Sequence, residues 1–269
     1  MRRIFGLLLL VLPLAALAQN AVNGTWKIDL NKLQMDEKPS VYELKNGEFT
    51  CSSCVPKYTI KADGEYHAVQ GNPYSDQISA KIVDPHTVEI SGMKGDRLVF
   101  REMNTISDDG KTVTQKYEGH PTDSAQPVTA TGIFSRIGEA QPGAHLLSGS
   151  WKPEKVESAS DNALSFRYTT TRDGVDFRAS TGEHYSAKFD GKEYPFHGDP
   201  GTTSVSLHKI DANTFEETYR RNGEVTGNAQ ITISPDGKTM TLVSHDARRN
   251  TTDRMVAERA NDGSSMADK

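Results

Sequence analysis

The 269-residue chain has little of what builds large apolar cores or charged binding surfaces. It holds two cysteines, 7% aromatic residues and a formal charge of −5. A negative chain has no electrostatic attraction to DNA, RNA or anionic lipid, so we expect no nucleic-acid partner. Beyond residue 18 no apolar run approaches the roughly 20 residues that a membrane-spanning helix needs, so we expect no membrane span.

Signatures of catalysis and of cofactor binding are also missing. The sequence has no Gly-x-Ser-x-Gly motif, no Gly-x-x-x-x-Gly-Lys phosphate loop and no His or Cys residues at zinc spacing. The neighbouring carboxylates Glu216 and Glu217 would face opposite sides of a strand and cannot share a proton. We therefore assign no catalytic residue, no metal ligand and no cofactor, and an enzyme is the less favoured class.

The N-terminus has the pattern of a secretory signal peptide. Arg2 and Arg3 form a charged start, residues 4–12 are apolar, and residues 16–18 form a small-x-small cleavage site. The apolar stretch is shorter than a bilayer requires. We expect cleavage after Ala18 and a periplasmic or secreted mature protein.

The rest of the chain contains one sequence pattern twice. Residues 106–114 match residues 233–241 at an offset of 127, and Trp26 matches Trp151 at an offset of 125. A repeat of this length gives each copy enough residues for a core of its own. We predict a first module at 23–138, a linker at 139–147, a second module at 148–260 and a disordered tail at 261–269.

Each copy has the pattern of strands and tight turns. Asp-Gly and Asn-Gly pairs, which suit two-residue hairpin turns, recur along both copies. Polar and apolar residues alternate between them, as in residues 77–82 and 203–210, so one face of each strand is buried. The spacing predicts an all-β fold of two tandem antiparallel up-and-down barrels, with about eight strands each.

A Gly-x-Trp motif at the start of such a meander resembles the lipocalin-type barrel family. In that family the Trp lies on the first strand at the closed end of the barrel, and an Arg from the last strand stacks over it. The resemblance implies a cation–π pair within each copy, Trp26 with Arg136 and Trp151 with Arg259. Arg254 is the other candidate in the second copy, and the alternative is that both Trp residues are ordinary core aromatics.

The chain also resembles exported bacterial proteins that share the Gly-Thr-Trp-Lys start, a Cys-x-x-Cys followed by Pro and Tyr, and the Asp-Gly-Lys-Thr turn. That resemblance implies a lipocalin-like barrel and no settled activity.

The two cysteines, Cys51 and Cys54, lie in the first copy alone. In an oxidising compartment we expect them to form a structural disulfide, worth about 2 kcal/mol through loop closure. A redox site would need a thiolate at a helix N-terminus, which a strand-rich region does not offer. Metal binding and free thiols stay open as alternatives.

Aromatic residues gather around the central hairpin of each copy. They form either cross-strand pairs or the lining of a ligand-binding mouth, for which the candidates are Tyr66, Tyr74, Tyr194 and Phe196. We expect an exported, non-enzymatic protein that binds a small apolar ligand or an envelope component. The alternatives are a structural or interaction module of the cell envelope and a hydrolase or isomerase on a barrel scaffold. The sequence does not indicate an oligomeric state.

Overall fold

The computed structural model describes residues 21–121 and 126–260, so the predicted signal peptide and tail lie outside it. The described chain is almost entirely β-structure, with only a 3-10 turn η1 (Leu30–Lys32) and a short helix α2 (Asp161–Leu164) besides the strands. No helix in these ranges is long and apolar enough to cross a membrane.

Twenty strands form two separate sheets, which confirms the all-β prediction. The strands of the first half are β1 (Gly24–Ile28), β2 (Ser40–Lys45), β3 (Glu48–Cys51), β4 (Tyr58–Lys61), β5 (His67–Ala68), β6 (Gln77–Asp84), β7 (Thr87–Lys94), β8 (Arg97–Ile106), β9 (Thr112–Gly119) and β10 (Val128–Ile137). Those of the second half are β11 (Gly149–Ala159), β12 (Ser165–Thr170), β13 (Gly174–Ala179), β14 (His184–Lys188), β15 (Tyr194–His197), β16 (Ser204–Lys209), β17 (Thr214–Arg221), β18 (Glu224–Ile233), β19 (Thr239–Asp246) and β20 (Thr251–Arg259).

Each sheet is an antiparallel meander that curves into a barrel. Barrel 1 has the strand order β4-β3-β2-β11-β10-β9-β8-β7-β6-β5, and barrel 2 closes fully as β1-β12-β13-β14-β15-β16-β17-β18-β19-β20. Barrel 1 is nearly closed, because an isolated backbone β-bridge joins Asp63, just after the edge strand β4, to Lys81 on β6. Each barrel has ten strands rather than the predicted eight or so, because elements as short as β5 contain too few residues to show an alternation.

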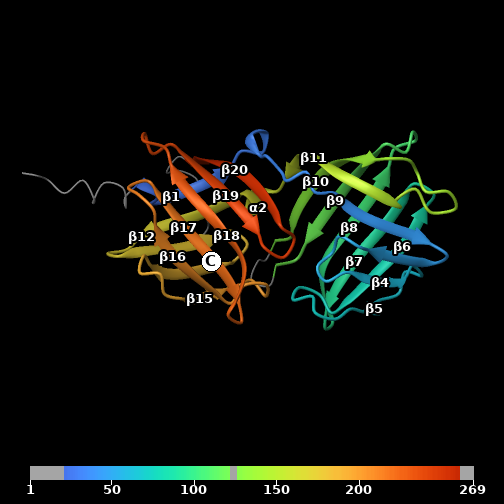
Figure 1. Cartoon of the computed structure of the whole chain (residues 1–269), viewed down its shortest axis with the longest axis horizontal. Helices are drawn as coiled ribbons and strands as arrows, with labels where there is room; N and C mark the ends of the chain where they lie inside the picture. Colours follow the sequence, from blue (N-terminus) through green and yellow to red (C-terminus); the bar gives the residue numbers. More distant parts are fainter. Residues whose placement is uncertain (1–20, 122–125, 261–269) are drawn as a thin grey trace, which may run out of the picture.

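The two barrels exchange their first strands. β1, from the first module, lies between β12 and β20 in barrel 2, while β11, from the second module, lies between β2 and β10 in barrel 1. Figure 1 shows the exchange, with each barrel built mainly from one half of the chain. The barrels are therefore not the contiguous segments 23–138 and 148–260 that the repeat predicts. A repeat shows which segments are alike. It does not show whether the first strand of a copy pairs with its own copy or with the other one.

The exchange corrects the predicted Trp–Arg pairs. The Arg259 guanidinium lies over the Trp26 ring, 4.3 Å from its centroid, and the Arg136 guanidinium lies over the Trp151 ring at 4.1 Å. The residues and the stacking are those the resemblance implies, but each pair joins the two modules instead of lying within one. Arg254 is not a Trp partner; it pairs through its backbone with Gln34.

We call each of these arrangements a clasp: the Trp, its Arg and the backbone they bind. In barrel 2, Arg259 Nε donates to the Gly237 carbonyl at 2.7 Å and Trp26 Nε1 donates to the Val22 carbonyl at 2.9 Å. Gly24 sits beside the guanidinium, where an added Cβ would lie 2.3 Å from Arg259 Nη1. The Gly-x-Trp motif and the Asp-Gly-Lys turn are thus parts of one assembly.

The clasp of barrel 1 repeats this arrangement. Arg136 Nε donates to the Gly110 carbonyl at 2.6 Å, and Trp151 Nε1 donates to the Leu147 carbonyl at 2.7 Å. Leu147 is fully buried, so the end of the predicted linker is part of the barrel floor. The exposed part of the connection is shorter, at residues 137–143.

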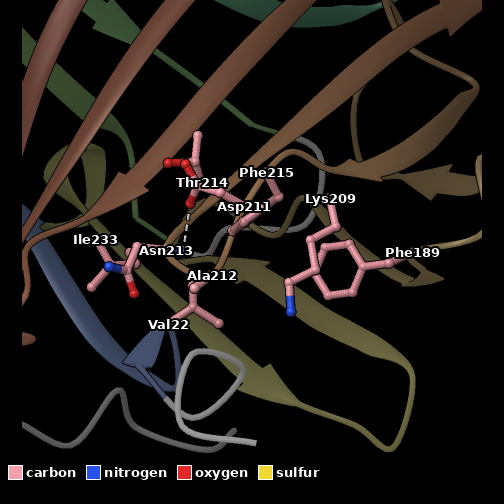
Figure 2. A pocket seen from close by; sticks show the side chains of 9 residues that line it. All are labelled: Val22, Phe189, Lys209, Asp211, Ala212, Asn213, Thr214, Phe215 and Ile233. Carbon is pink, nitrogen blue, oxygen red and sulfur yellow. Dashed lines mark hydrogen bonds between the residues drawn. The ribbon is translucent and has the colours of Figure 1, made fainter. Parts of the chain in front are cut away.

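The closed end of barrel 2 is well filled. Its hollow has a volume of about 20 Å³, which is room for about one water molecule. Figure 2 shows Val22 among the side chains around this hollow. This hollow is therefore too small for an organic ligand.

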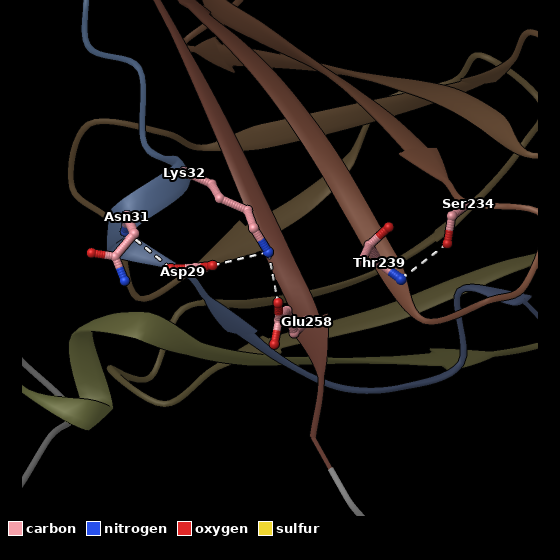
Figure 3. A network of polar contacts seen from close by, with 6 residues as sticks. All are labelled: Asp29, Asn31, Lys32, Ser234, Thr239 and Glu258. Carbon is pink, nitrogen blue, oxygen red and sulfur yellow. Dashed lines mark hydrogen bonds and ion pairs between the residues drawn. The ribbon is translucent and has the colours of Figure 1, made fainter.

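The chain crosses from barrel 2 to barrel 1 along β20. In this crossing segment, residues 29–39, the Asp29 amide donates to the Val256 carbonyl at 2.8 Å. Lys32 Nζ lies 3.0 Å from Asp29 and 2.7 Å from Glu258 on β20. Figure 3 shows the Lys32 side chain between these two carboxylates. These ion pairs are at least partly exposed and stabilise little, so the exchanged strands are held mainly by their strand pairing and by the buried clasps.

Cutting the connection between the modules will not separate them. A protease site inserted between Pro142 and Gly143, where the chain is exposed, leaves one borrowed strand in each barrel. We expect the two fragments to co-elute at the size of the uncut protein in gel filtration and to separate only in denaturant. Two folded fragments that elute apart would contradict the exchange.

The close approach at the clasp makes its glycine irreplaceable. Gly149 has φ +137°, and a Cβ there would lie 2.6 Å from Arg136 Nη1. We expect Gly149→Ala to lower the unfolding free energy of barrel 1 by about 3 kcal/mol, through backbone strain and a displaced guanidinium. Urea unfolding followed by Trp fluorescence measures this loss. The control is Gly143→Ala, which has a positive φ but no neighbour within 4 Å and should lose about 1 kcal/mol. Equal losses at both positions would contradict the role of the clasp.

Candidate functional site

The end of barrel 2 opposite its clasp is an open cavity, which we call the mouth. Its volume is about 340 Å³, within the range of small-molecule sites. It is bordered by strands β13, β15 and β17, by the loop between β13 and β14, and by the loop between β15 and β16. Its lining residues are Phe177, Ala179, Thr181, Glu183, Phe196, Asp199, Thr202 and Tyr219.

A buried carboxylate lies beneath the mouth. Glu217 is only 2% exposed and accepts a hydrogen bond from Tyr168 Oη at 2.7 Å. Tyr185 donates to the same carboxylate oxygen, and Tyr219 donates to the other one. Tyr219 is therefore shared between this cluster and the wall of the mouth.

Burial governs the ionisation of this cluster. Desolvation raises the pKa of Glu217, and the three tyrosine hydroxyls oppose that rise by donating to the charged form. Burial and the neighbouring carboxylate together raise the pKa of Tyr168, Tyr185 and Tyr219 well above the usual value of 10.0. The tyrosines consequently stay protonated and act as hydrogen-bond donors.

Barrel 1 has a different interior carboxylate, Glu102 on β8. Its Oε1 accepts from Asn104 Nδ2 and from Gln115 Nε2, each at 2.8 Å. Desolvation raises the pKa of Glu102. Glu102 faces Ile90 on the neighbouring strand, whereas in barrel 2 Glu217 faces Ala229. With the 127-residue offset, Ile90 corresponds to Glu217 and Glu102 to Ala229. The two barrels therefore carry their interior carboxylate on different strands. In barrel 1 it lies on β8, at the position that pairs directly with the equivalent of Glu217 on β7.

The matching end of barrel 1 is built from other side chains. By strand pairing Cys51 takes the place of Phe177, and by the 127-residue offset Gly92 takes that of Tyr219. A Cβ on Gly92 would lie 2.3 Å from the Phe100 ring, so that ring fills the space. The predicted disulfide is confirmed, and Cys51 belongs to the buried core of barrel 1, with Cys54 packed against it. The disulfide and Phe100 thus occupy the region that is open in barrel 2.

Of the four aromatic candidates from the sequence, Phe196 lines the mouth. Tyr194 Oη donates to Asp190, and the Tyr66 hydroxyl lies 3.0 Å from that of Ser91. Tyr74, from barrel 1, packs against Gly201 at the rim of the mouth.

The histidines form no metal site. His184 and His197 stack as a cross-strand pair with ring centroids 5.1 Å apart. Within residues 21–121 and 126–260 there is no group of three or more side chains placed to hold a metal ion.

Glu217 and the tyrosines bound to it are not among the site residues predicted from the sequence, although the sequence carries a signal for the carboxylate. Phe215, Glu217 and Tyr219 alternate along one strand, so the face that buries the two aromatics also buries the carboxylate. A charged residue on an apolar face predicts a buried polar cluster.

Comparisons with known proteins do not assign the chain. No protein-family model matches it, and no curated protein is significantly similar to it.

The stability contribution of Glu217 should depend on pH. Because its pKa is raised above the ordinary 4.5, the folded state binds more protons than the unfolded state between the two values. The unfolding free energy of the wild type, relative to Glu217→Gln, should therefore fall as pH rises above about 4.5. It should become constant above the folded-state pKa. Chemical unfolding of both proteins across this pH range measures the difference. A difference that is flat, or that rises with pH, would contradict a raised pKa.

Proposed function

We propose that the protein is a non-enzymatic binding protein that holds a small ligand with an apolar body in the mouth of barrel 2. The observation that carries the proposal is the open cavity of about 340 Å³ with aromatic walls. Small-molecule sites are concave, largely apolar and equipped with a few polar groups, and barrel mouths are a frequent location for them.

The rigidity of the floor supports this proposal. Tyr219 is held by Glu217, which is itself held by Tyr168 and Tyr185. Phe177 stacks on Tyr185 at 5.3 Å between centroids, so the wall and the floor are packed together. A site whose side chains are fixed in advance loses less entropy when a ligand binds.

We propose further that the barrels are lipocalin-like and that the protein is exported. The Trp–Arg stack at the closed end of each barrel supports the likeness. A Cys51–Cys54 disulfide is compatible with an oxidising compartment, which agrees with the signal-peptide pattern.

A hydrolase or isomerase is the second candidate, because Tyr219 joins the cavity to a buried carboxylate. A tyrosine held in this way could donate a proton or a hydrogen bond to a reacting group. Binding is favoured, because the three hydroxyls already bond to Glu217 and its burial shields the carboxylate from a substrate.

The test is a native mass spectrum of the protein purified without detergent from its own source. We expect a bound mass on the wild type and none on Ala179→Trp, whose indole fills the mouth. Ser186→Trp, on the exposed face of β14, is the matched control and should keep the bound mass. A wild type with no bound mass, or a mass that survives in Ala179→Trp, would contradict the proposal.

A further inference from the structure

The lining of the mouth is acidic as well as aromatic. Glu183 lies in the turn between β13 and β14, and Asp199 lies in the loop between β15 and β16, so the two carboxylates enter from different loops. No Lys, Arg or His is among the residues that line this cavity in the described chain.

These carboxylates bind neutral groups only. Thr181 Oγ1 donates to Glu183, and the Gly201 amide donates to Asp199 Oδ1 at 2.8 Å. Among the described residues neither carboxylate has a recorded ion pair, and the pairs of Asp173 with Lys188 and Asp190 with Lys192 lie near the closed end of the barrel.

Arg248, which reaches the rim through Tyr74, is already engaged by another carboxylate. Arg248 Nη2 lies 3.5 Å from Asp246 and also interacts with the Tyr74 hydroxyl, which in turn bonds to Asp199. Asp199 therefore meets Arg248 only through a tyrosine. The mouth keeps a negative potential that a small cation would neutralise.

The aromatic rings are arranged to present their faces and edges around one space. Phe196 and Tyr219 meet edge to face, at 6.1 Å and 89°, and Phe196 also contacts Tyr185 at 5.8 Å. Ring faces carry negative charge density, so they attract an ammonium group within about 6 Å. The aromatic walls and the carboxylates thus both favour a positively charged ligand.

Barrel 1 provides a comparison within the chain. The 127-residue offset places Pro56 at the position of Glu183, Asn72 at that of Asp199 and Val69 at that of Phe196. Barrel 1 has no carboxylate and no aromatic residue at these three positions, whereas in barrel 2 the three residues line one cavity.

We propose that the ligand of the mouth is a small organic cation, an amine or quaternary ammonium group on an apolar body. The apolar body would lie against Phe177 and Phe196, and the cationic group would lie between Glu183 and Asp199. The inference rests on the proposed function and adds the charge of the ligand.

Three probes with a shared phenyl group and different polar groups test the charge: phenethylamine, 2-phenylethanol and 3-phenylpropionate. Isothermal titration calorimetry at pH 7 and low salt should rank the amine first and the carboxylate last. We expect the amine to bind about tenfold more tightly than the alcohol, equivalent to about 1.4 kcal/mol. Added salt should reduce that ratio.

Two matched double variants distinguish the effect of the rim carboxylates on binding from the effect of the barrel's net charge. Glu183→Gln combined with Asp199→Asn should remove the preference for the amine and leave the affinity for the alcohol unchanged, which also shows that the cavity is intact. Asp173→Asn combined with Asp190→Asn makes the same change of charge in exposed turns near the closed end and should keep the preference.

The outcomes distinguish the two proposals. An amine that binds no better than the alcohol, or a preference that survives the rim variant, overturns the cation assignment and leaves a binding site in place. Failure of all three probes to bind overturns the assignment too, and the native mass spectrum then decides separately whether the mouth holds any ligand.

Discussion

The interaction on which the rest of the structure depends is the stack of an arginine over a tryptophan at the closed end of each barrel. The stack joins the first strand of a barrel to its last strand, and in barrel 2 the same guanidinium binds the turn between β18 and β19. Because the Trp strand comes from the other module, each clasp also joins the two halves of the chain. The clasps therefore link two small barrels, each with its own apolar core, to each other.

Closure at one end leaves the other end free to differ between the barrels. In barrel 1 a disulfide and Phe100 occupy the space, whereas in barrel 2 Phe177 and Tyr219 border an open mouth. A duplicated module can lose a cavity in one copy without losing its fold, since its stability depends on the clasp and the sheet. The cysteine pair that distinguishes the two copies in sequence thus lies at the end where they differ in structure.

The all-β class and the duplication were predictable from alternation and from the repeated motifs, and the lipocalin-type resemblance implied the Trp and Arg residues that stack. The sequence could not predict the exchange, because Trp26 and Trp151 carry the same motif and fit either barrel. Alternation with Phe215 and Tyr219 indicates that Glu217 faces inward, but it does not show that Tyr168 and Tyr185, from other strands, bind its carboxylate. The mouth depends on which large side chain fills each end, and that is decided by residues far apart in the chain.

The interior carboxylates show how this divergence was constrained. Glu102 and Glu217 occupy positions that pair across two neighbouring strands, and each barrel uses only one of the two. Side chains paired in this way are about 5 Å apart at Cβ, so two carboxylates there would repel strongly in a buried environment. A single carboxylate is held by hydrogen bonds, from two amides to one oxygen in barrel 1 and from three tyrosines to both oxygens in barrel 2. The choice of tyrosines has a consequence, because Tyr219 reaches the mouth while its hydroxyl stays fixed on Glu217. The buried charge thereby fixes an aromatic wall of the binding site.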